Sequence, residues 1–137
     1  MESRTIDESG TTQAQEVVRD IYQALAGGDF AAFLGRLASN VEWTVAAGLP
    51  QGGVYIGPEA VAGLFAGYAE VWDDFQVVPA EIYGSQHTVL ALGHYRGTHR
   101  VTRKSVVARF AHVWHIEDGK AVRFETINDS HTIVAAG

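Results

Sequence analysis

The sequence contains no cysteine, which excludes disulfides, zinc sites with thiolate ligands and thiol nucleophiles. Its first stretch, MESRTIDESGTTQ, has no apolar core and is polar and acidic, unlike a signal peptide or a membrane span. We therefore expect a cytoplasmic protein with no membrane partner.

Basic residues are scarce. The 10 Lys and Arg are outnumbered by 16 Asp and Glu, so the formal net charge is -6, and only the run HRVTRK at residues 99–104 groups several cations. A protein that binds nucleic acid needs a broad cationic surface to neutralise phosphates. We expect no nucleic-acid partner.

Apolar residues are abundant, at 47% of the 137 residues, whereas 19% are charged. This balance is typical of a globular protein, and the length suits a single domain with a sizeable core. The polar start predicts a disordered leader over residues 1–12, followed by one domain over residues 13–137.

Three segments carry apolar residues at spacings of three and four, the pattern of a helix with one buried face. The spacing predicts helices over residues 13–26, from 30 to about 39, and from 58 to about 74. Thr12 and Gln15 have the spacing of a capping box at the start of the first helix.

Strand patterns fill the rest of the chain. Between residues 46 and 57 the stretch AAGLPQGGVYIG, with four glycines and a proline, predicts an irregular loop. Asp118 and Gly119 favour a two-residue hairpin turn. The predicted strands cover residues 41–45, 75–84, 87–98, 104–117 and 120–129. This order predicts an α+β domain in which a curved antiparallel sheet wraps around the three helices of the N-terminal half.

The last two strands alternate between bulky or uncharged residues and charged ones, which separates the two faces of the sheet. His112 falls on the inward face and His115 on the outward face, so the stretch HVWH is not a metal motif with two histidines, and we expect no metal. The inward set on these strands includes His112, Trp114, Phe124, Thr126 and Asn128.

Two interpretations of this inward set remain open. With Trp43, it resembles an apolar pocket that contains a few polar groups. Alternatively, His112 is a core residue bonded to a neighbour, the tryptophans are ordinary core, and Asn128 and Asp129 simply end a strand.

Four segments together resemble the SnoaL-like proteins, relatives of polyketide cyclases and ketosteroid isomerases within the nuclear transport factor 2-like superfamily. The resemblance covers about residues 13–135, and its segments are IYQALAGGDFAAF (21–33), GVYIGPEAVAGLF (53–65), GHYRGTHR (93–100) and RFAHVWHIEDGKAVRFETINDS (109–130). It implies a cone-shaped, cystatin-like α+β barrel with a cavity between sheet and helices, and commonly a homodimer formed through the sheet.

Comparison with ketosteroid isomerases places their catalytic aspartate at Val45, their helix tyrosine at Ile21 and their protonated acid at His112. Two of these three roles are therefore empty. Tyr22 is one step from Ile21, about 100° around a helix, so it replaces the tyrosine only if the helix is shifted. The departure argues against ordinary steroid isomerisation.

The resemblance nevertheless favours a cofactor-independent isomerase, cyclase or hydrolase that acts on a hydrophobic carbonyl-type substrate, with His112 and Asp129 as the acid/base pair. The alternative is a ligand-binding or dimeric accessory domain without turnover, which the empty base position favours. The residues predicted to contact the small molecule are Tyr22, Trp43, Trp114, Phe124, Thr126 and Asn128.

Overall fold

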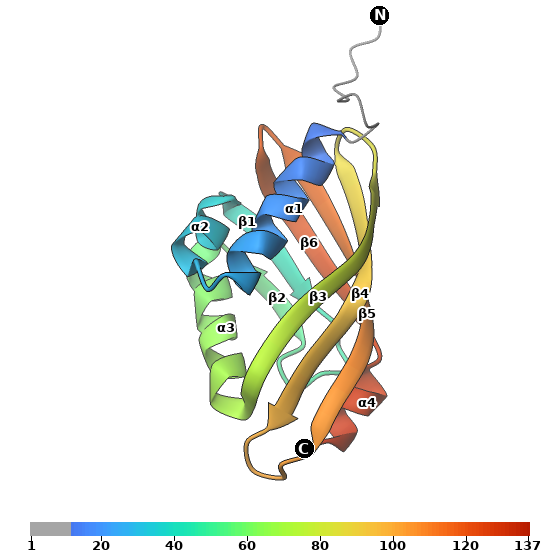
Figure 1. Cartoon of the computed structure of the whole chain (residues 1–137). Coiled ribbons are helices and arrows are strands. Elements are labelled where there is room, and N and C mark those ends of the chain that lie inside the picture. Colours follow the sequence, from blue (N-terminus) through green and yellow to red (C-terminus); the bar gives the residue numbers. More distant parts are fainter. Residues whose placement is uncertain (1–11) are drawn as a thin grey trace, which may run out of the picture.

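The computed structural model describes residues 12–137. A single curved sheet lies against helix α1, with α2 and α3 beside α1, and the sheet does not close into a barrel (Figure 1). The α+β class predicted from the sequence is confirmed. The predicted leader lies outside the described residues, except for Thr12.

The three predicted helices are present: α1 is Gln13–Ala26, α2 is Phe30–Gly35 and α3 is Pro58–Val71. The capping box of α1 is confirmed, because the Gln15 N–H donates to Thr12 Oγ1 at 3.1 Å and the Thr12 N–H donates to Gln15 Oε1 at 2.9 Å. These bonds satisfy donors that the first turn would otherwise leave unpaired, and so they fix where α1 begins.

The six strands form one sheet in the order β2-β1-β6-β5-β4-β3. They are β1 Leu37–Val45, β2 Gly53–Ile56, β3 Trp72–Gly84, β4 Thr88–His99, β5 Ser105–Glu117 and β6 Lys120–Asn128. Neighbouring strands are antiparallel except β1 and β6, which are parallel, so the sheet is mixed where a purely antiparallel one was predicted. The predicted hairpin joins β5 to β6, with φ of 51° at Asp118 and 76° at Gly119.

Three boundaries differ from the sequence prediction. Strand β1 begins at Leu37, which pairs with Ala121, so it takes residues assigned to the second helix. The loop predicted over residues 46–57 contains β2, which pairs with β1. Trp72 opens β3 rather than extending α3, because its backbone is extended (φ -121°, ψ 133°) and it pairs with His99. In each case pairing with a distant strand overrides the local pattern.

A fourth helix, α4 (Ser130–Ala135), was not predicted. It follows β6 directly, and Asp129 caps its start. Its far end is held to the turn between β4 and β5, since the Thr102 hydroxyl donates to the Ala136 carbonyl at 2.5 Å. The C-terminal segment therefore returns to the end of the sheet where β4 meets β5 (Figure 1).

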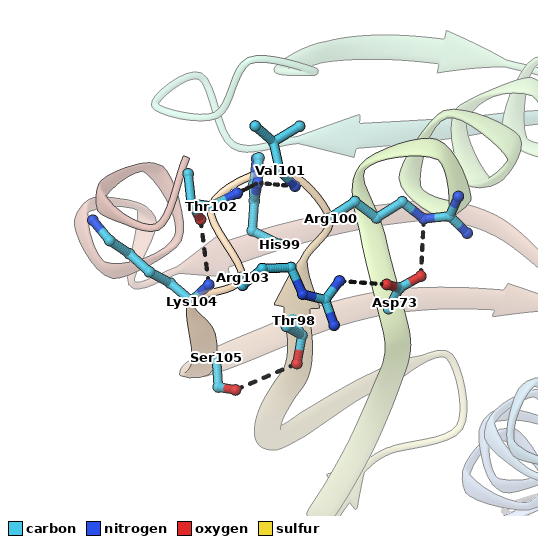
Figure 2. A network of polar contacts seen from close by, with 9 residues as sticks. All are labelled: Asp73, Thr98, His99, Arg100, Val101, Thr102, Arg103, Lys104 and Ser105. Atoms are coloured by element: carbon cyan, nitrogen blue, oxygen red, sulfur yellow. Dashed lines mark hydrogen bonds and ion pairs between the residues drawn. The ribbon is translucent and has the colours of Figure 1, made fainter.

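The basic run at residues 99–104 forms that turn and is tied to the start of β3. Figure 2 shows Asp73 between two arginines: Arg100 Nε lies 3.0 Å from one carboxylate oxygen and Arg103 Nη1 lies 2.8 Å from the other. The hydrogen bond from Arg103, followed by the positive charges of the two arginines, lowers the pKa of Asp73. Two of the cations in the run are thus engaged within the fold.

Candidate functional site: a buried histidine between two tyrosines

A pocket lies between the sheet and helices α1 and α3, and its volume is about 80 Å³. Most of its wall is apolar. Of the eight site residues predicted from the sequence, all but Asp129 line this one pocket: Tyr22, Trp43, His112, Trp114, Phe124, Thr126 and Asn128. Five of these residues lie on β5 and β6, on the face that alternation predicted to point inward.

His112 is the polar centre of the pocket. It is 3% exposed, and both ring nitrogens meet hydroxyl groups: Tyr22 Oη lies 2.7 Å from Nδ1 and Tyr95 Oη lies 2.6 Å from Nε2. The Phe110 ring stacks on the imidazole at 3.7 Å between centroids. Burial holds the pKa of His112 well below its ordinary value, so the ring is neutral.

Tyr22 reaches this site from α1. It is 3% exposed, and its hydroxyl also accepts a hydrogen bond of 3.0 Å from Trp114 Nε1. Burial raises the pKa of Tyr22 far above neutral pH, so the hydroxyl keeps its proton. Ile21 is buried as well, at 0% exposed, and so the helix presents two consecutive residues to the interior. Tyr22, one residue after the position where the resemblance expects a tyrosine, thus brings a hydroxyl to His112.

Tyr95 was not predicted from the sequence. It lies on β4, and its hydroxyl bonds His112 on the neighbouring strand β5. Alternation along β4 would have placed Tyr95 on the inward face, because Val89 and Ala91 on that face are both 0% exposed and Tyr95 continues the series. Gly93 interrupts that series, which weakened the pattern. Burial raises the pKa of Tyr95 well above its ordinary value, so this hydroxyl is also protonated.

Aromatic rings form the wall around the histidine. Trp43 stacks on Phe124 at 3.8 Å and meets Trp114 edge-on at 5.6 Å. Trp43 is 4% exposed and Trp114 is 1% exposed, and both belong to the main core cluster. These tryptophans are therefore both core residues and pocket residues, because one side of each ring packs in the core and the other side forms the pocket wall.

Thr126 and Asn128 supply the remaining predicted polar groups. Thr126 Oγ1 accepts from the Ala46 N–H at 3.0 Å and from Asn128 Nδ2 at 3.2 Å. Asn128 Oδ1 is buried without a hydrogen-bond partner among the described residues. An unpaired buried acceptor is costly unless something bonds it, which distinguishes Asn128 from a residue that simply ends a strand.

Asp129 is not brought to His112. Its carboxylate caps α4, accepting from the Thr132 N–H at 3.2 Å and from the Thr132 hydroxyl at 2.6 Å. These bonds lower the pKa of Asp129, and the residue is exposed and outside the pocket lining. The inward alternation of β6 ends at Asn128, and the chain then leaves the sheet and enters α4, which was not predicted from the sequence. The predicted pair of His112 and Asp129 is therefore not assembled.

Val45 lines the pocket at 2% exposed, where the ketosteroid isomerases carry their catalytic aspartate, and its side chain cannot accept a proton. Within residues 12–137, no Asp or Glu lines the pocket, and no three His, Asp or Glu side chains are grouped so as to hold a metal ion. Over the same residues, no helix combines the length and hydropathy that crossing a membrane requires.

Comparison with solved structures finds the same fold. An NTF2-like protein from Burkholderia thailandensis E264 is 34% identical, with a TM-score of 0.86 over 89% of this chain and 95% of that one. An NTF2-like protein of unknown function from Burkholderia pseudomallei K96243 is 27% identical, with a TM-score of 0.85 over 92% and 98%. TerC, co-crystallized with polyporic acid, is 22% identical, with a TM-score of 0.83 over 91% and 98%.

Among curated proteins, none matches the chain significantly. The profile of the SnoaL-like domain matches residues 18–124, a span that includes Tyr22, Tyr95 and His112 and ends before Thr126 and Asn128. The expectation drawn from the four sequence segments is confirmed, and the chain belongs to the family of SnoaL-like domains.

Proposed function

We propose that this protein binds a small, mostly apolar molecule in the pocket and holds a carbonyl-type oxygen of that molecule at the Tyr95 hydroxyl beside His112. One observation carries the proposal: a buried, neutral imidazole lies between two tyrosine hydroxyls in a pocket whose other walls are aromatic. Apolar walls with a few convergent polar groups favour a ligand that is apolar over most of its surface and polar at one point.

The size of the pocket limits the ligand. A cavity of about 150 Å³ is known to accept benzene, whereas this pocket measures about 80 Å³. A ring-sized ligand therefore needs lining side chains to move. The segment over residues 46–52, which contributes Leu49 and Gln51 to the lining, is the part we expect to shift.

A catalytic version of this function follows from the same contacts. Hydroxyl donors aimed at a carbonyl oxygen stabilise the negative charge that develops there when a water molecule takes a proton from the neighbouring carbon and an enolate forms. This would make the protein a cofactor-independent isomerase, cyclase or hydrolase that acts on a hydrophobic carbonyl-type substrate. TerC, which shares the fold and was crystallized with polyporic acid, supports a small organic ligand.

Binding without turnover is the second candidate. The observation that favours it is that no carboxylate lines the pocket in the described part of the chain, so a strong base for removing a carbon-bound proton is missing there. The two candidates share the ligand contacts and differ only in proton transfer.

Titration with cyclohexanone, followed by NMR, tests the ligand proposal. Binding in the pocket predicts saturable shifts of the Trp43 and Trp114 indole resonances, with no shifts of residues on the outer face of the sheet, such as Val107. If the indole resonances stay unchanged to saturating ketone, the proposal is wrong.

Turnover is tested with the same ketone in deuterated water. A catalyst that forms the enolate speeds the exchange of the hydrogens next to the carbonyl for deuterium, and His112→Gln abolishes that gain. Binding with an exchange rate equal to that of the buffer identifies the non-catalytic version.

We also propose that the protein is a cytoplasmic homodimer that pairs through the outer face of the sheet. Exposed apolar side chains lie on that face on each of four neighbouring strands: Tyr83, Leu90, Val107 and Ile127 are 53%, 36%, 59% and 58% exposed. In sedimentation experiments the wild type should be a dimer and Val107→Lys a monomer. The control is Val101→Lys, in the β4–β5 turn, which should remain a dimer. A wild type that sediments as a monomer contradicts the dimer.

A further inference from the structure

Four side chains form one continuous chain of hydrogen bonds through the pocket wall. Trp114 Nε1 lies 3.0 Å from Tyr22 Oη, Tyr22 Oη lies 2.7 Å from His112 Nδ1, and His112 Nε2 lies 2.6 Å from Tyr95 Oη. The groups come from α1, β4 and β5, so the chain of bonds links a helix to the centre of the sheet. Its direction can be worked out from what each group is able to donate.

The direction is set at the Trp114 end. An indole N–H can only donate, so the Tyr22 oxygen accepts from it. The hydrogen of the Tyr22 hydroxyl then needs an acceptor, and within the described residues its one other bonded neighbour is His112 Nδ1. If Nδ1 carried a proton, the Tyr22 hydrogen would be buried without a partner. Nδ1 is therefore the acceptor.

The protonation of the other ring nitrogen, Nε2, follows from that of Nδ1. A neutral imidazole carries one proton, which must then be on Nε2, from where it is donated to the Tyr95 oxygen. Within residues 12–137, no charged side chain bonds His112, and burial holds its pKa low, so the neutral form applies. The hydroxyl hydrogen of Tyr95 is left over. Its oxygen makes no other hydrogen bond in the described chain, and the residue lines the pocket.

We propose that Trp114 and Tyr22 hold His112 as the Nε2–H tautomer, and that Tyr95 therefore presents its hydroxyl hydrogen to the pocket and selects ligands that carry an oxygen acceptor. The selection rests on the proposed function, because it concerns the same pocket and ligand class. The tautomer does not depend on it. Each bond in the chain polarises the next, which strengthens the final donor.

Trp114 and Tyr22 are positioning residues in this scheme, since they act on the ligand only through His112. Tyr95 is the group that contacts the ligand. A pocket in which His112 were the Nδ1–H tautomer would instead have Tyr95 donating to Nε2 and offering only its oxygen, so it would favour ligands that donate.

The tautomer is measured first, in the full-length protein without ligand. Two-dimensional NMR of protein labelled with nitrogen-15 in histidine distinguishes a protonated ring nitrogen from an unprotonated one. We expect Nε2 protonated and Nδ1 unprotonated in His112 at neutral pH. The Tyr22→Phe variant, which removes the donor to Nδ1, should lose this preference, whereas Tyr83→Phe should keep it. A protonated Nδ1 in the wild type overturns the proposal, whatever ligand binds.

The second measurement tests the selection with a matched ligand pair. Cyclohexanone and methylenecyclohexane have nearly the same shape, but only the ketone accepts a hydrogen bond. We expect the ratio of ketone affinity to hydrocarbon affinity to be about 3- to 10-fold higher in the wild type than in Tyr95→Phe, the range of one hydrogen bond. The NMR spectrum of Tyr95→Phe verifies that it is folded.

The outcomes separate the two proposals. If the wild type binds the ketone and Tyr95→Phe shows the same ratio of ketone to hydrocarbon affinity, the role of Tyr95 is overturned and the proposed function stands. If neither compound binds the wild type, the proposed function and the selection fall together, and the tautomer result remains as a test of the hydrogen-bond direction alone.

Discussion

The hydroxyl of Tyr22 lies 2.7 Å from Nδ1 of His112, although 90 residues separate them in the sequence. One belongs to the first helix and the other to the fifth strand, so the bond ties the two main layers of the fold at the pocket. Because Trp114 donates to the same hydroxyl at 3.0 Å, Tyr22 serves two partners at once. The Tyr22 hydroxyl thus belongs both to the pocket and to the packed core.

Replacing this hydroxyl tests its contribution to stability. Tyr22→Phe leaves the Trp114 N–H and His112 Nδ1 without their partner in a buried position, so we expect the free energy of unfolding to fall by about 1–3 kcal/mol. Urea unfolding measures the change. The matched control is Tyr83→Phe, whose hydroxyl bonds Glu81 at the surface and whose loss should leave stability unchanged. Equal effects of the two variants would contradict a structural role for the Tyr22 hydroxyl.

Stability should depend on pH through His112. Its pKa in the folded protein lies well below the 6.5 of an unperturbed histidine, so between these values the unfolded chain binds the extra proton. The contribution of His112 to stability is therefore fully present above pH 6.5. As the pH falls below that value, the free energy of unfolding decreases by at most about 1.4 kcal/mol per pH unit.

Unfolding curves at several pH values check this dependence. In His112→Asn the slope below pH 6.5 should become shallower, whatever the absolute stability of the variant. His115→Asn, on the outer face of the same strand, should keep the wild-type slope. A wild type whose stability is flat over this range would show that the ring is not held neutral.

Asp129→Ala tests whether this residue only caps α4 or also takes part in catalysis. We expect a lower melting temperature, because α4 loses the carboxylate that accepts from Thr132, together with unchanged ketone affinity, because the residue is outside the pocket lining. Asp29→Ala removes the corresponding cap of α2 and is the control for the stability change alone. A loss of ligand affinity or turnover specific to Asp129→Ala would restore it to the site.

Gly93 is expected to tolerate no side chain. A Cβ there would collide with the Val78 carbonyl and lie 2.8 Å from both the Phe110 ring and Pro79 Cα. Gly93→Ala should therefore destabilise the protein by about 1–3 kcal/mol and disturb the Phe110 ring that stacks on His112. Gly63→Ala, where nothing lies within 4 Å on α3, should be neutral or stabilising by up to about 1 kcal/mol. The comparison is made by urea unfolding.

The periodic parts of the sequence predicted the fold well. The spacing over residues 13–26 gave α1 to the residue, and the dipeptide of Asp118 and Gly119 gave the last hairpin. Boundaries that depend on pairing between distant strands were missed. Leu37 joins β1 because Ala121 is available to pair with it, and no local pattern contains that information.

The site was predicted only in part, for the same reason. Alternation places a side chain on a face, which was enough for His112, Thr126 and Asn128, but it does not say which side chains from other elements meet there. Tyr95 was missed because Gly93 breaks the apolar series on β4. Asp129 was assigned to the pocket from the family resemblance, and the local pattern did not reveal that a helix begins directly after it.

The most direct test is the carbon-13 NMR signal of cyclohexanone labelled at its carbonyl carbon and bound to the protein. A carbonyl that accepts a hydrogen bond from Tyr95 is polarised, so its bound signal should move downfield from the value in an apolar solvent, and the displacement should vanish in Tyr95→Phe. A bound signal at the apolar-solvent position in the wild type would contradict the account, because the ketone would then occupy the pocket without its oxygen reaching the network at His112.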